Sequence, residues 1–546
     1  MKEIIKTISR KEKRLIILLS VFVVVITFLP YIFGYLRTPE ESFYTGIHAL
    51  TPGDTNVYYS YLEQVEQGDV VFKDLYTSES QSVSLIKPFW ATVGIFGKVL
   101  HLPHWLTLQI TRSILIFVFI AFAYIFIAYI FSNKQHRKIA IILLLFSSGL
   151  GGLLSPFLEH LKYIGEGYYH WPMDLWVPES VTFLSMFHIP HILFSSILSL
   201  VVFLSLLISF ETNRYKYSVV AGVAALIWFS FHPFHFFTLL AVVTAYLFLK
   251  GIMDRKIPFI YFKHFFITIL IALPSVVYHF VIIAQDYLMA GRAEQNILYT
   301  PVWWLLIISY GFVGILAVVG VAKIFKKKDN KWLFVAVWFI VQTLLLYAPL
   351  AFQRRLSQNL HFPMVLLATL AVIYLANKYK NAKIIRYITD NKLVLIFVFT
   401  ILIAFSNVYA LVNDFLLYKN MTYPFFYLSD DYRGSFDWIK ENIGEDGVIL
   451  SEWIDGNFIP GYSGRTVYLG HGVETINYEF KQEQVSWLFQ SNLELEAKQE
   501  FLMQNNINFI FFSDRSRELG DFDPANKKFL KEEFISDQVS IYRVIE

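Results

Sequence analysis

The chain has 546 residues, of which 56% are hydrophobic and only 16% are charged. About a quarter of the residues of a soluble globular protein are charged, so this composition excludes an ordinary soluble domain and indicates a membrane protein. The net charge of +3 comes without a basic domain, so no nucleic-acid partner is expected. The absence of cysteine excludes disulfides, thiolate nucleophiles and cysteine-based zinc or iron–sulfur sites.

Long apolar stretches predict about eleven membrane-spanning helices, because about 20 apolar residues cross the roughly 30 Å of hydrocarbon in a bilayer. The first is interpreted as a retained anchor, since no small-residue cleavage site follows it. A further apolar stretch, 82–101, contains Lys87 and Pro88 and predicts a short helix at the membrane interface. The spans are predicted at 15–36, 105–131, 139–158, 181–210, 218–231, 236–250, 257–285, 301–325, 332–352, 363–377 and 393–412.

Lysines and arginines indicate how these helices are oriented. Basic residues gather before the first span and after the second, fourth, eighth and tenth spans, and all of these positions lie on one side of the membrane. The positive-inside rule assigns that side to the cytoplasm. We therefore expect the N-terminus in the cytoplasm and, after an odd number of crossings, the C-terminal region outside the cell membrane.

The pattern changes beyond about Asp430. "SFDWIKENIG" and "LELEAKQEFLMQ" have helical periodicity, whereas "GVILS", "NFIFF" and "VSIYRV" are typical of buried strands. This alternation predicts a small α/β domain. The expected organisation is a transmembrane domain at 1–412 with its first external loop at 37–104, a linker at 413–429, and an extracytoplasmic α/β domain at 430–546.

The first external loop places an acid, Asp54, soon after the first crossing, in "TPGDTNVYYSYLEQVEQGDV". Asp54 has a structural alternative to a functional role: it caps the helix that begins near it, or it occupies the third position after a Thr51 cap. The two roles are compatible. Glu63 and Glu66 lie one helical turn apart, which favours a solvated helix face.

Two histidine pairs also fall on the outer side, His188 with His191 in "HIPH" and His232 with His235 in "HPFH". Each pair has the i, i+3 spacing of two metal ligands, but each contains a proline and no cysteine helps to complete a site, so interfacial hydrogen bonding is favoured. The glycines of "SSGLGGLLS" (147–155) do not follow a strand, so they predict close helix packing rather than nucleotide binding.

Arg354 and Arg355 lie outside in "AFQRRLSQNLHF", against the positive-inside rule. Interfacial arginines can bind any lipid headgroup, and a guanidinium pair is also suited to bidentate binding of a lipid-linked phosphate or diphosphate. The sequence contains no Walker loop and no Rossmann glycine pattern. A lipid-phosphate donor is therefore favoured over a soluble nucleotide donor.

Three segments resemble the membrane glycosyltransferases of the C-type (GT-C) fold, which use polyprenyl-phosphate-linked sugars. They are "PGDTNVYYSYLEQ", "WVPESVTFLSMFHIPH" and "FQRRLSQNLHFPMVLLATLA". The segment that begins "DWIKENIG" looks like the extracytoplasmic domain of many bacterial members. The resemblance implies a polytopic α-helical membrane protein with a C-terminal α/β domain. The acid motif of the family is commonly Asp-Glu or Asp-Asp, whereas here Thr55 follows Asp54, which leaves the metal requirement open.

The resemblance also implies a mechanism and partners. Asp54 would act as general base on an acceptor hydroxyl, and Arg354 and Arg355 would stabilise the departing polyprenyl phosphate. Glu179 would orient the acceptor or a divalent metal, which is the only cofactor that the resemblance leaves open. The expected partners are a polyprenyl-phosphate-linked sugar, an extracytoplasmic glycan, lipid or protein acceptor, and membrane lipids. The further substrate-binding candidates are Asn56, Tyr58, His188, His191, His232 and His235.

Two other classes of protein compete with this interpretation. Proline-broken helices and outer-face histidines suit a lipid or solute transporter, although we find no inverted repeat and no relay of charged residues inside the membrane. The missing second acid at position 55 favours a non-catalytic envelope-assembly protein. Assays of sugar transfer and of substrate counterflow separate the three.

Overall fold

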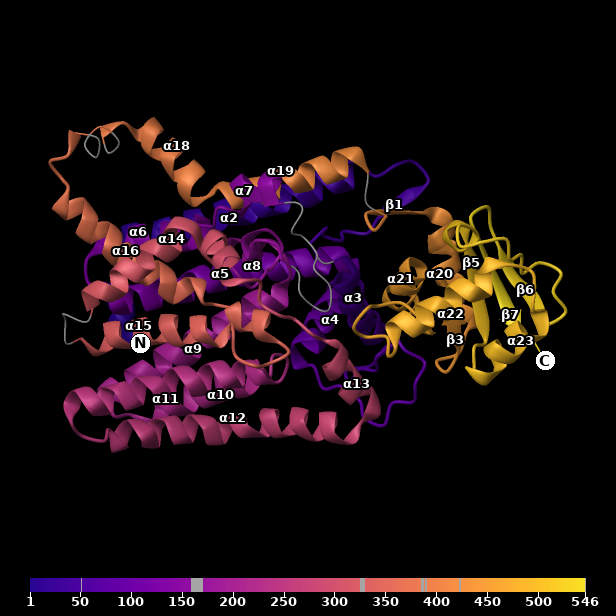
Figure 1. The fold of residues 1–546 in the computed structure, drawn as a ribbon, viewed down its shortest axis with the longest axis horizontal. Helices are drawn as coiled ribbons and strands as arrows, with labels where there is room; N and C mark the ends of the chain where they lie inside the picture. The colour runs from indigo at the N-terminus through magenta and orange to yellow at the C-terminus, as the bar shows by residue number, and fades with distance from the viewer. Residues whose placement is uncertain are drawn as a thin grey trace. The chain divides into compact units, whose positions relative to one another are not determined.

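The computed structural model describes residues 1–50, 52–158, 170–324, 329–383, 387, 390–421 and 424–545 (Figure 1). The chain forms two compact units, each assembled from three separate stretches. Unit 1 contains Met1–Pro30, Gln109–His279 and Ile297–Leu416. Unit 2 contains Tyr31–Leu108, Phe280–Asn296 and Leu417–Glu546.

Helices dominate the first three-quarters of the chain and alternate with strands in the last quarter (Figure 1). The helices are α1 (Lys2–Lys6), α2 (Arg10–Leu36), α3 (Pro52–Gln67), α4 (Pro88–Leu100), α5 (His104–Ile130), α6 (Lys134–Phe146), α7 (Gly151–Leu158), η2 (Met173–Leu175), α8 (Thr182–Phe187), α9 (Pro190–Thr212), α10 (Tyr215–Phe229), α11 (His235–Asp254), α12 (Phe259–Gln285), α13 (Tyr287–Gln295), α14 (Trp303–Ile324), α15 (Asn330–Leu345), η3 (Gln353–Ser357), α16 (His361–Lys378), α18 (Lys392–Ile403), α19 (Phe405–Asn420), α20 (Asp430–Asn442), α21 (Trp453–Ser463), α22 (Tyr478–Gln490), α23 (Leu495–Gln504) and α24 (Asp514–Arg517). The strands are β1 (Ser42–Tyr44), β2 (Tyr427–Ser429), β3 (Val448–Leu450), β4 (Thr466–Val467), β5 (Phe509–Ser513), β6 (Leu530–Ile535) and β7 (Val539–Val544).

The described residues contain eight helical spans that are long and apolar enough to cross a membrane. The pair α18–α19, bent by 79°, makes a ninth if it is counted as one span. The shorter apolar helices α10 and α15 coincide with two more of the predicted spans. Every predicted span therefore overlaps a helix, and the prediction of a polytopic helical membrane protein is confirmed.

Several spans predicted to be continuous are broken in the structure. The span 181–210 divides between α8 and α9, because Pro190 cannot continue a helix but fits its first turn. The span 139–158 divides between α6 and α7 around Gly149. A Cβ at Gly149 would lie 2.2 Å from the carbonyl oxygen of Ser309, so the backbones touch there. This contact confirms the prediction of close packing by these glycines.

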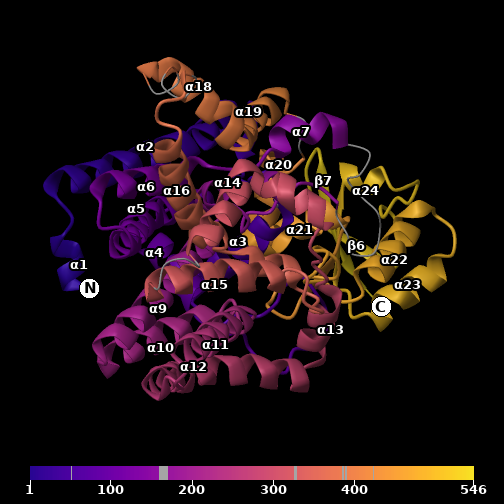
Figure 2. The ribbon, with the colours of Figure 1, turned by 60° about the vertical axis from the view of Figure 1, so that its left-hand side comes forward.

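Another backbone contact brings two helices of unit 1 together. Helix α14 packs along α16, and the two lie side by side in Figures 1 and 2. A Cβ at Gly320 would lie 2.2 Å from the carbonyl oxygen of Leu367. Small residues allow this approach inside a membrane, where apolar side chains gain little by leaving lipid for protein.

The last part of unit 2 is an α/β domain, as the sequence predicts. Its five-stranded sheet has the order β4-β3-β5-β7-β6. Strand β3 runs parallel to β4 and β5, whereas β7 is antiparallel to β5 and β6. The three predicted strands are β3, β5 and β7. Strand β4 is only two residues long and β6 is rich in charge, which explains why neither is apparent from apolar runs.

Helices cover both faces of this sheet. Residues of β5 alternate between the faces, so Ile510 and Phe512 lie in the core formed with α22 and α23. On the other face Phe511 stacks against Phe436 of α20, with ring centroids 6.2 Å apart. The sheet is therefore buried on both sides, which accounts for the unbroken apolar sequence of β5.

Helix α3, from the predicted first external loop, packs against α21 of the C-terminal region within unit 2. A Cβ at Gly461 would lie 3.2 Å from the carbonyl oxygen of Asn56 and from Cβ of Tyr59, so glycine permits this close approach. Pro52 occupies the first position of α3, where its missing N–H costs no helical hydrogen bond.

The prediction that Glu63 lies on a solvated helix face is wrong. Its side chain is buried, with Oε1 2.6 Å from Nζ of Lys440 and Oε2 3.3 Å from Nε2 of His104. Residues distant in the sequence cover this face of α3, whereas Glu66 is only half-buried. Burial opposes ionisation of Glu63, but its histidine and lysine partners outweigh that effect and lower its pKa.

Candidate functional site

Asp54 is the third residue of α3, and its side chain is 46% exposed. An acid in the first turn of a helix interacts favourably with the positive end of the helix dipole. Thr51, the predicted cap, lies outside the described residues. Thr55, where the family motif commonly carries a second acid, is buried.

His471, from the loop after β4, reaches Asp54. Its Nε2 lies 3.1 Å from Oδ1 of Asp54. Its Nδ1 accepts hydrogen bonds from the backbone N–H groups of Val473 and Glu474, at 3.2 and 3.1 Å. Because Nδ1 is an acceptor, the ring hydrogen is on Nε2 and is donated to Asp54.

The surroundings also affect the charge state of His471. Burial opposes the imidazolium form, but the hydrogen bond and charge of Asp54, with the charges of Glu474 and Asp74, raise the pKa of His471 above its ordinary value. A second proton on Nδ1 requires the release of two backbone N–H groups. In either charge state Nε2 carries a hydrogen, so the donation to Asp54 persists.

Asp54 and His471 open onto a pocket of about 250 Å³. Three elements of unit 2 form its wall: the start of α3, the first turns of α21, and the loop after β4. The lining residues are Gly53, Asp54, Trp453, Asn457, His471 and Gly472.

Asn457 holds these three elements together. Its Oδ1 accepts a hydrogen bond of 2.7 Å from Nδ2 of Asn56, and its own Nδ2 donates to the carbonyl oxygens of Gly470, at 2.8 Å, and Gly53, at 3.4 Å. Its backbone carbonyl accepts from the hydroxyl of Tyr76 at 3.1 Å. The amide of Asn457 is thus engaged by protein and serves to fix the wall of the pocket.

A buried ion cluster fixes the loop that carries His471. The guanidinium of Arg292 in α13 contacts the carboxylates of Glu474 and Asp74, the latter at 3.4 Å. Burial and the nearby carboxylate of Glu474 raise the pKa of Asp74, whereas Arg292, opposing the effect of burial, holds the pKa of Glu474 below its ordinary value. Burial lowers the pKa of the neighbouring Lys87 to about 8.

The other two candidates on α3 contribute to packing. Asn56 is fully buried beneath the pocket wall. Tyr58 is half-buried and stacks on Trp90 of α4, with ring centroids 4.4 Å apart and planes at 10°. The predicted short helix at 82–101 is thus present as α4.

Arg354 and Arg355 lie in η3 of unit 1, and both are half-buried. The guanidinium of Arg354 lies 4.2 Å from the ring centroid of Trp176, and that of Arg355 lies 5.7 Å from the ring of Phe234. Nε of Arg355 is buried without a hydrogen-bond partner among the described residues. Glu179 is half-buried in the same unit, and no hydrogen bond or ion pair joins it to the described residues.

Three of the four candidate histidines form one buried group in unit 1. The rings of His191 and His232 are 5.2 Å apart, and those of His232 and His235 are 5.8 Å apart. Nε2 of His235 hydrogen bonds to Oε1 of Gln358 at 2.7 Å, as a structural histidine would. His188 is buried as well. Among the described residues, no three His, Asp or Glu side chains form a group that could hold a metal ion.

Asp174 and Arg112 are buried charged residues of unit 1 that are not among the site candidates predicted from the sequence. Asp174 is fully buried and accepts a hydrogen bond from the backbone N–H of Gly151 at 3.1 Å; burial raises its pKa to about 7. Arg112 is buried within α5, where its guanidinium donates to Oγ1 of Thr27 at 2.8 Å and to the carbonyl of Met186 at 2.7 Å. These contacts join α5 to α2 and α8.

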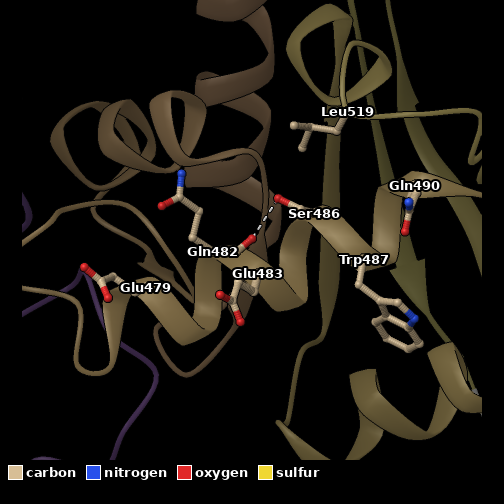
Figure 3. A pocket seen from close by; sticks show the side chains of 7 residues that line it. All are labelled: Glu479, Gln482, Glu483, Ser486, Trp487, Gln490 and Leu519. Atoms are coloured by element: carbon tan, nitrogen blue, oxygen red, sulfur yellow. Dashed lines mark hydrogen bonds between the residues drawn. The ribbon is translucent and has the colours of Figure 1, made fainter.

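Unit 2 has a second, wider hollow of about 600 Å³ along α22 (Figure 3). Two of its polar groups are engaged within the protein: the hydroxyl of Ser486 donates to the backbone carbonyl of Gln482, and Nε1 of Trp487 donates to Glu494. It is an open surface groove, and nothing in it corresponds to the Asp54–His471 pair. The lining residues are Glu479, Gln482, Glu483, Ser486, Trp487, Gln490 and Leu519.

Comparison with solved structures identifies the fold. The archaeal oligosaccharyltransferase AglB from Archaeoglobus fulgidus, in complex with an inhibitory peptide and a dolichol-phosphate, gives a TM-score of 0.52 at 11% identity, over 93% of this chain and 70% of that one. Its apo form gives 0.51 at 12% identity, over 94% and 73%. Comparison of the sequence with protein-family models and with curated proteins gives no match. This chain is therefore a multi-pass membrane protein with the GT-C fold, as the sequence resemblance implies.

The sequence placed Asp54 correctly at the start of a helix but did not identify its neighbours. His471 and Trp453 come from the C-terminal region, more than 390 positions further along the chain. The only signal was the segment "GYSGRTVYLGHGVET", in which a histidine stands between two glycines. Its contact with Asp54 spans 417 positions, a pairing that local patterns do not reveal.

Proposed function

We propose that this protein is a membrane glycosyltransferase that moves a sugar from a polyprenyl-phosphate donor to an acceptor hydroxyl. The observation that carries the proposal is the pocket at Asp54, where a partly exposed carboxylate is held by His471. The GT-C fold is compatible with this reaction, and the likeness to a structure that holds dolichol-phosphate supports a lipid-linked donor. Fold alone does not establish function, so the proposal depends on the site.

In the proposed reaction the acceptor hydroxyl oxygen forms a bond to the anomeric carbon of the donor sugar. The bond between that carbon and the phosphate oxygen breaks, and the polyprenyl phosphate leaves with the electron pair. The carboxylate of Asp54 takes the proton of the acceptor hydroxyl. A positioned general base of this kind typically contributes about 10²–10⁴ in rate. His471 acts as a positioning residue, because its Nε2–H donates to the carboxylate and fixes its orientation.

We propose that Arg354 and Arg355 bind the phosphate of the lipid donor. The buried Nε of Arg355 supports this role, because a buried donor without a partner costs about 1–3 kcal/mol that an anionic ligand would offset. Glu179 is half-buried in unit 1. We propose that it orients the acceptor or a metal. We also propose that the N-terminus is cytoplasmic and the α/β domain extracytoplasmic, from the distribution of basic residues.

The experiment that tests the proposal is the substitution Asp54→Asn. Asparagine has nearly the same shape as aspartate but cannot accept the proton. Loss of the charge in the first turn of the helix costs only about 0.3–1 kcal/mol, so the fold is expected to persist. Purified protein in proteoliposomes is supplied with polyprenyl-phosphate-linked hexoses and pentoses and with sugar, lipid and peptide acceptors. The variant is expected to lose at least about 100-fold in sugar transfer while its apparent Tm stays close to that of the parent.

The exposed Asp69 provides a matched control, because Asp69→Asn makes the same chemical change just beyond the end of the same helix at Gln67. It is expected to retain full transfer. Transfer retained in Asp54→Asn would refute the general-base role and leave Asp54 as a residue that stabilises the helix start. Transfer absent from the parent with every donor, combined with counterflow of a solute, would favour a transporter instead.

The phosphate role is tested separately by binding. Arg354→Ala and Arg355→Ala are expected to weaken binding of a short-chain polyprenyl-phosphate analogue by about tenfold or more each, since charged hydrogen bonds contribute roughly 1.5–3 kcal/mol. The exposed Arg214, between α9 and α10, gives the control variant Arg214→Ala. Equal binding by all three variants would make Arg354 and Arg355 general headgroup contacts.

A further inference from the structure

We infer that the pocket beside Asp54 binds a neutral sugar ring, stacked on the indole of Trp453, and that this ring belongs to the acceptor. The inference rests on the proposed glycosyl transfer, and it adds that the acceptor is a carbohydrate rather than a peptide or a simple lipid alcohol.

Trp453 provides an apolar face in a polar pocket. It is the first residue of α21, and Glu452 fixes that helix start by accepting a hydrogen bond of 2.8 Å from the backbone N–H of Ile454. The indole packs against the core of the α/β domain, and its ring centroid lies 6.1 Å from that of Phe425. The side chain remains partly exposed and lines the pocket next to Asp54. A rigid aromatic face with polar groups at its edge suits a sugar ring, whose C–H groups form an apolar face and whose hydroxyls point outward.

The composition of the lining disfavours binding of the donor phosphate in this pocket. None of the six lining residues is a lysine or an arginine. The ring N–H of His471 is already donated to Asp54, and the amide of Asn457 is engaged on both sides by protein. Asp54 brings a carboxylate to the lining, and its side chain is 46% exposed. An anion is disfavoured beside it, whereas a neutral hydroxyl is a suitable hydrogen-bond donor to it.

The size of the pocket limits the ligand to about one ring. Its volume of about 250 Å³ lies just below the roughly 300–1,000 Å³ of sites for drug-sized ligands. Gly472 contributes no side chain to the wall, and a Cβ built there has no atom within 4 Å. The ring that contributes the attacking hydroxyl fits this space, and any remaining part of the acceptor extends out of the pocket.

The first test measures binding without a donor. Saturation-transfer NMR on the purified full-length protein uses methyl α-D-mannopyranoside, methyl β-D-glucopyranoside, methyl β-D-galactopyranoside and a lysine-containing tetrapeptide as probes. At least one pyranoside is expected to bind saturably. Trp453→Ala is expected to weaken that binding about tenfold, and Trp453→Phe to retain part of it. Trp487→Ala provides the matched control, because Trp487 packs against the same core but lines the other hollow, and it is expected to leave the affinity unchanged.

Gly472→Leu provides a second variant that does not remove a packed side chain. It is expected to fill the pocket and abolish pyranoside binding at an unchanged Tm. In transfer assays Trp453→Ala is expected to raise the acceptor KM about tenfold and to leave the donor KM unchanged.

The inference is overturned if no pyranoside binds, if the tetrapeptide binds instead, if Trp453→Ala binds like the parent, or if its effect falls on the donor KM. Pyranoside binding that depends on Trp453 in a protein that transfers no sugar would uphold this site and refute the proposed function. Transfer that depends on Asp54 but not on Trp453 would do the reverse.

Discussion

Gly456 and Gly434 both lie within helices of unit 2, and replacing each with alanine is expected to have opposite effects. A Cβ at Gly456 in α21 would lie 1.9 Å from the carbonyl oxygen of Leu469, well below the 3.0 Å that real contacts respect. The two backbones must therefore separate by more than about 1 Å, and such overpacking typically costs about 1–3 kcal/mol. A Cβ at Gly434 in α20 meets only a ring carbon of Phe534, at 3.9 Å. Gly434→Ala should gain roughly 0.5–1 kcal/mol from helix propensity.

The displacement at Gly456 has a functional consequence. Asn457 directly follows Gly456, and His471 lies two residues after Leu469. A shift of about 1 Å would lengthen the 3.1 Å contact between His471 and Asp54 beyond hydrogen-bond range. Loss of this hydrogen bond is expected to slow sugar transfer about tenfold. A factor of ten corresponds to the lower end of the free energy of a charged hydrogen bond, and we use the lower end because the Asp54 side chain is nearly half-exposed.

Both variants are measured as full-length protein in detergent, by apparent Tm and by transfer rate. For a cooperative unit of about 150–250 residues, Tm shifts by roughly 2–4 °C for each kcal/mol of change in the free energy of unfolding. Gly456→Ala should therefore lower Tm by about 2–12 °C, and Gly434→Ala should raise it by about 1–4 °C. If Gly456→Ala is as stable and as active as Gly434→Ala, the close contact between α21 and the loop after β4 does not exist in solution.

Three further predictions concern His471, Glu63 and the orientation of the chain in the membrane. His471→Leu should reduce kcat about tenfold and His471→Gln, which keeps a donor, should restore most of it; equal loss in both would exclude the hydrogen bond to Asp54 as the cause. Because the pKa of Glu63 is lowered in the folded protein, its ionised form contributes stability above the unfolded pKa near 4.5, and this stability is lost as pH falls. Glu63→Gln should therefore lose less Tm than the parent between about pH 5 and 3. An equal fall of Tm with pH in both proteins would contradict this. In the cysteine-free background, an impermeant maleimide applied to intact cells should label Asp446→Cys and not Asn133→Cys, both at exposed positions; the reverse would overturn the orientation.

Local sequence patterns determine the helices and strands of this protein, whereas contacts between distant residues determine which side chains are buried and which meet at the site. Apolar length predicts the membrane helices, and the alternation of apolar strands with amphipathic helices predicts the α/β domain, because both depend on neighbouring residues. Glu63 shows the limit: its spacing from Glu66 indicates a wet helix face, yet Lys440 and His104 cover it. The same limit applies to Asp54, whose position at a helix start was predictable. Its partner His471 was not, since only the folded chain brings them together.

The contacts of α3 also have a consequence for the order in which the chain folds during synthesis. The buried amide of Asn56 has its partner 401 residues later, and Asp54 has its partner 417 residues later. A helix whose polar groups are unpaired cannot bury them without cost, so α3 cannot reach its final packing while the ribosome is still making the transmembrane helices. The stretch that carries the proposed base is therefore among the first to be synthesised and among the last to be completed. A chain truncated before α21 would lack the partner of α3 and would leave the buried face of this helix exposed.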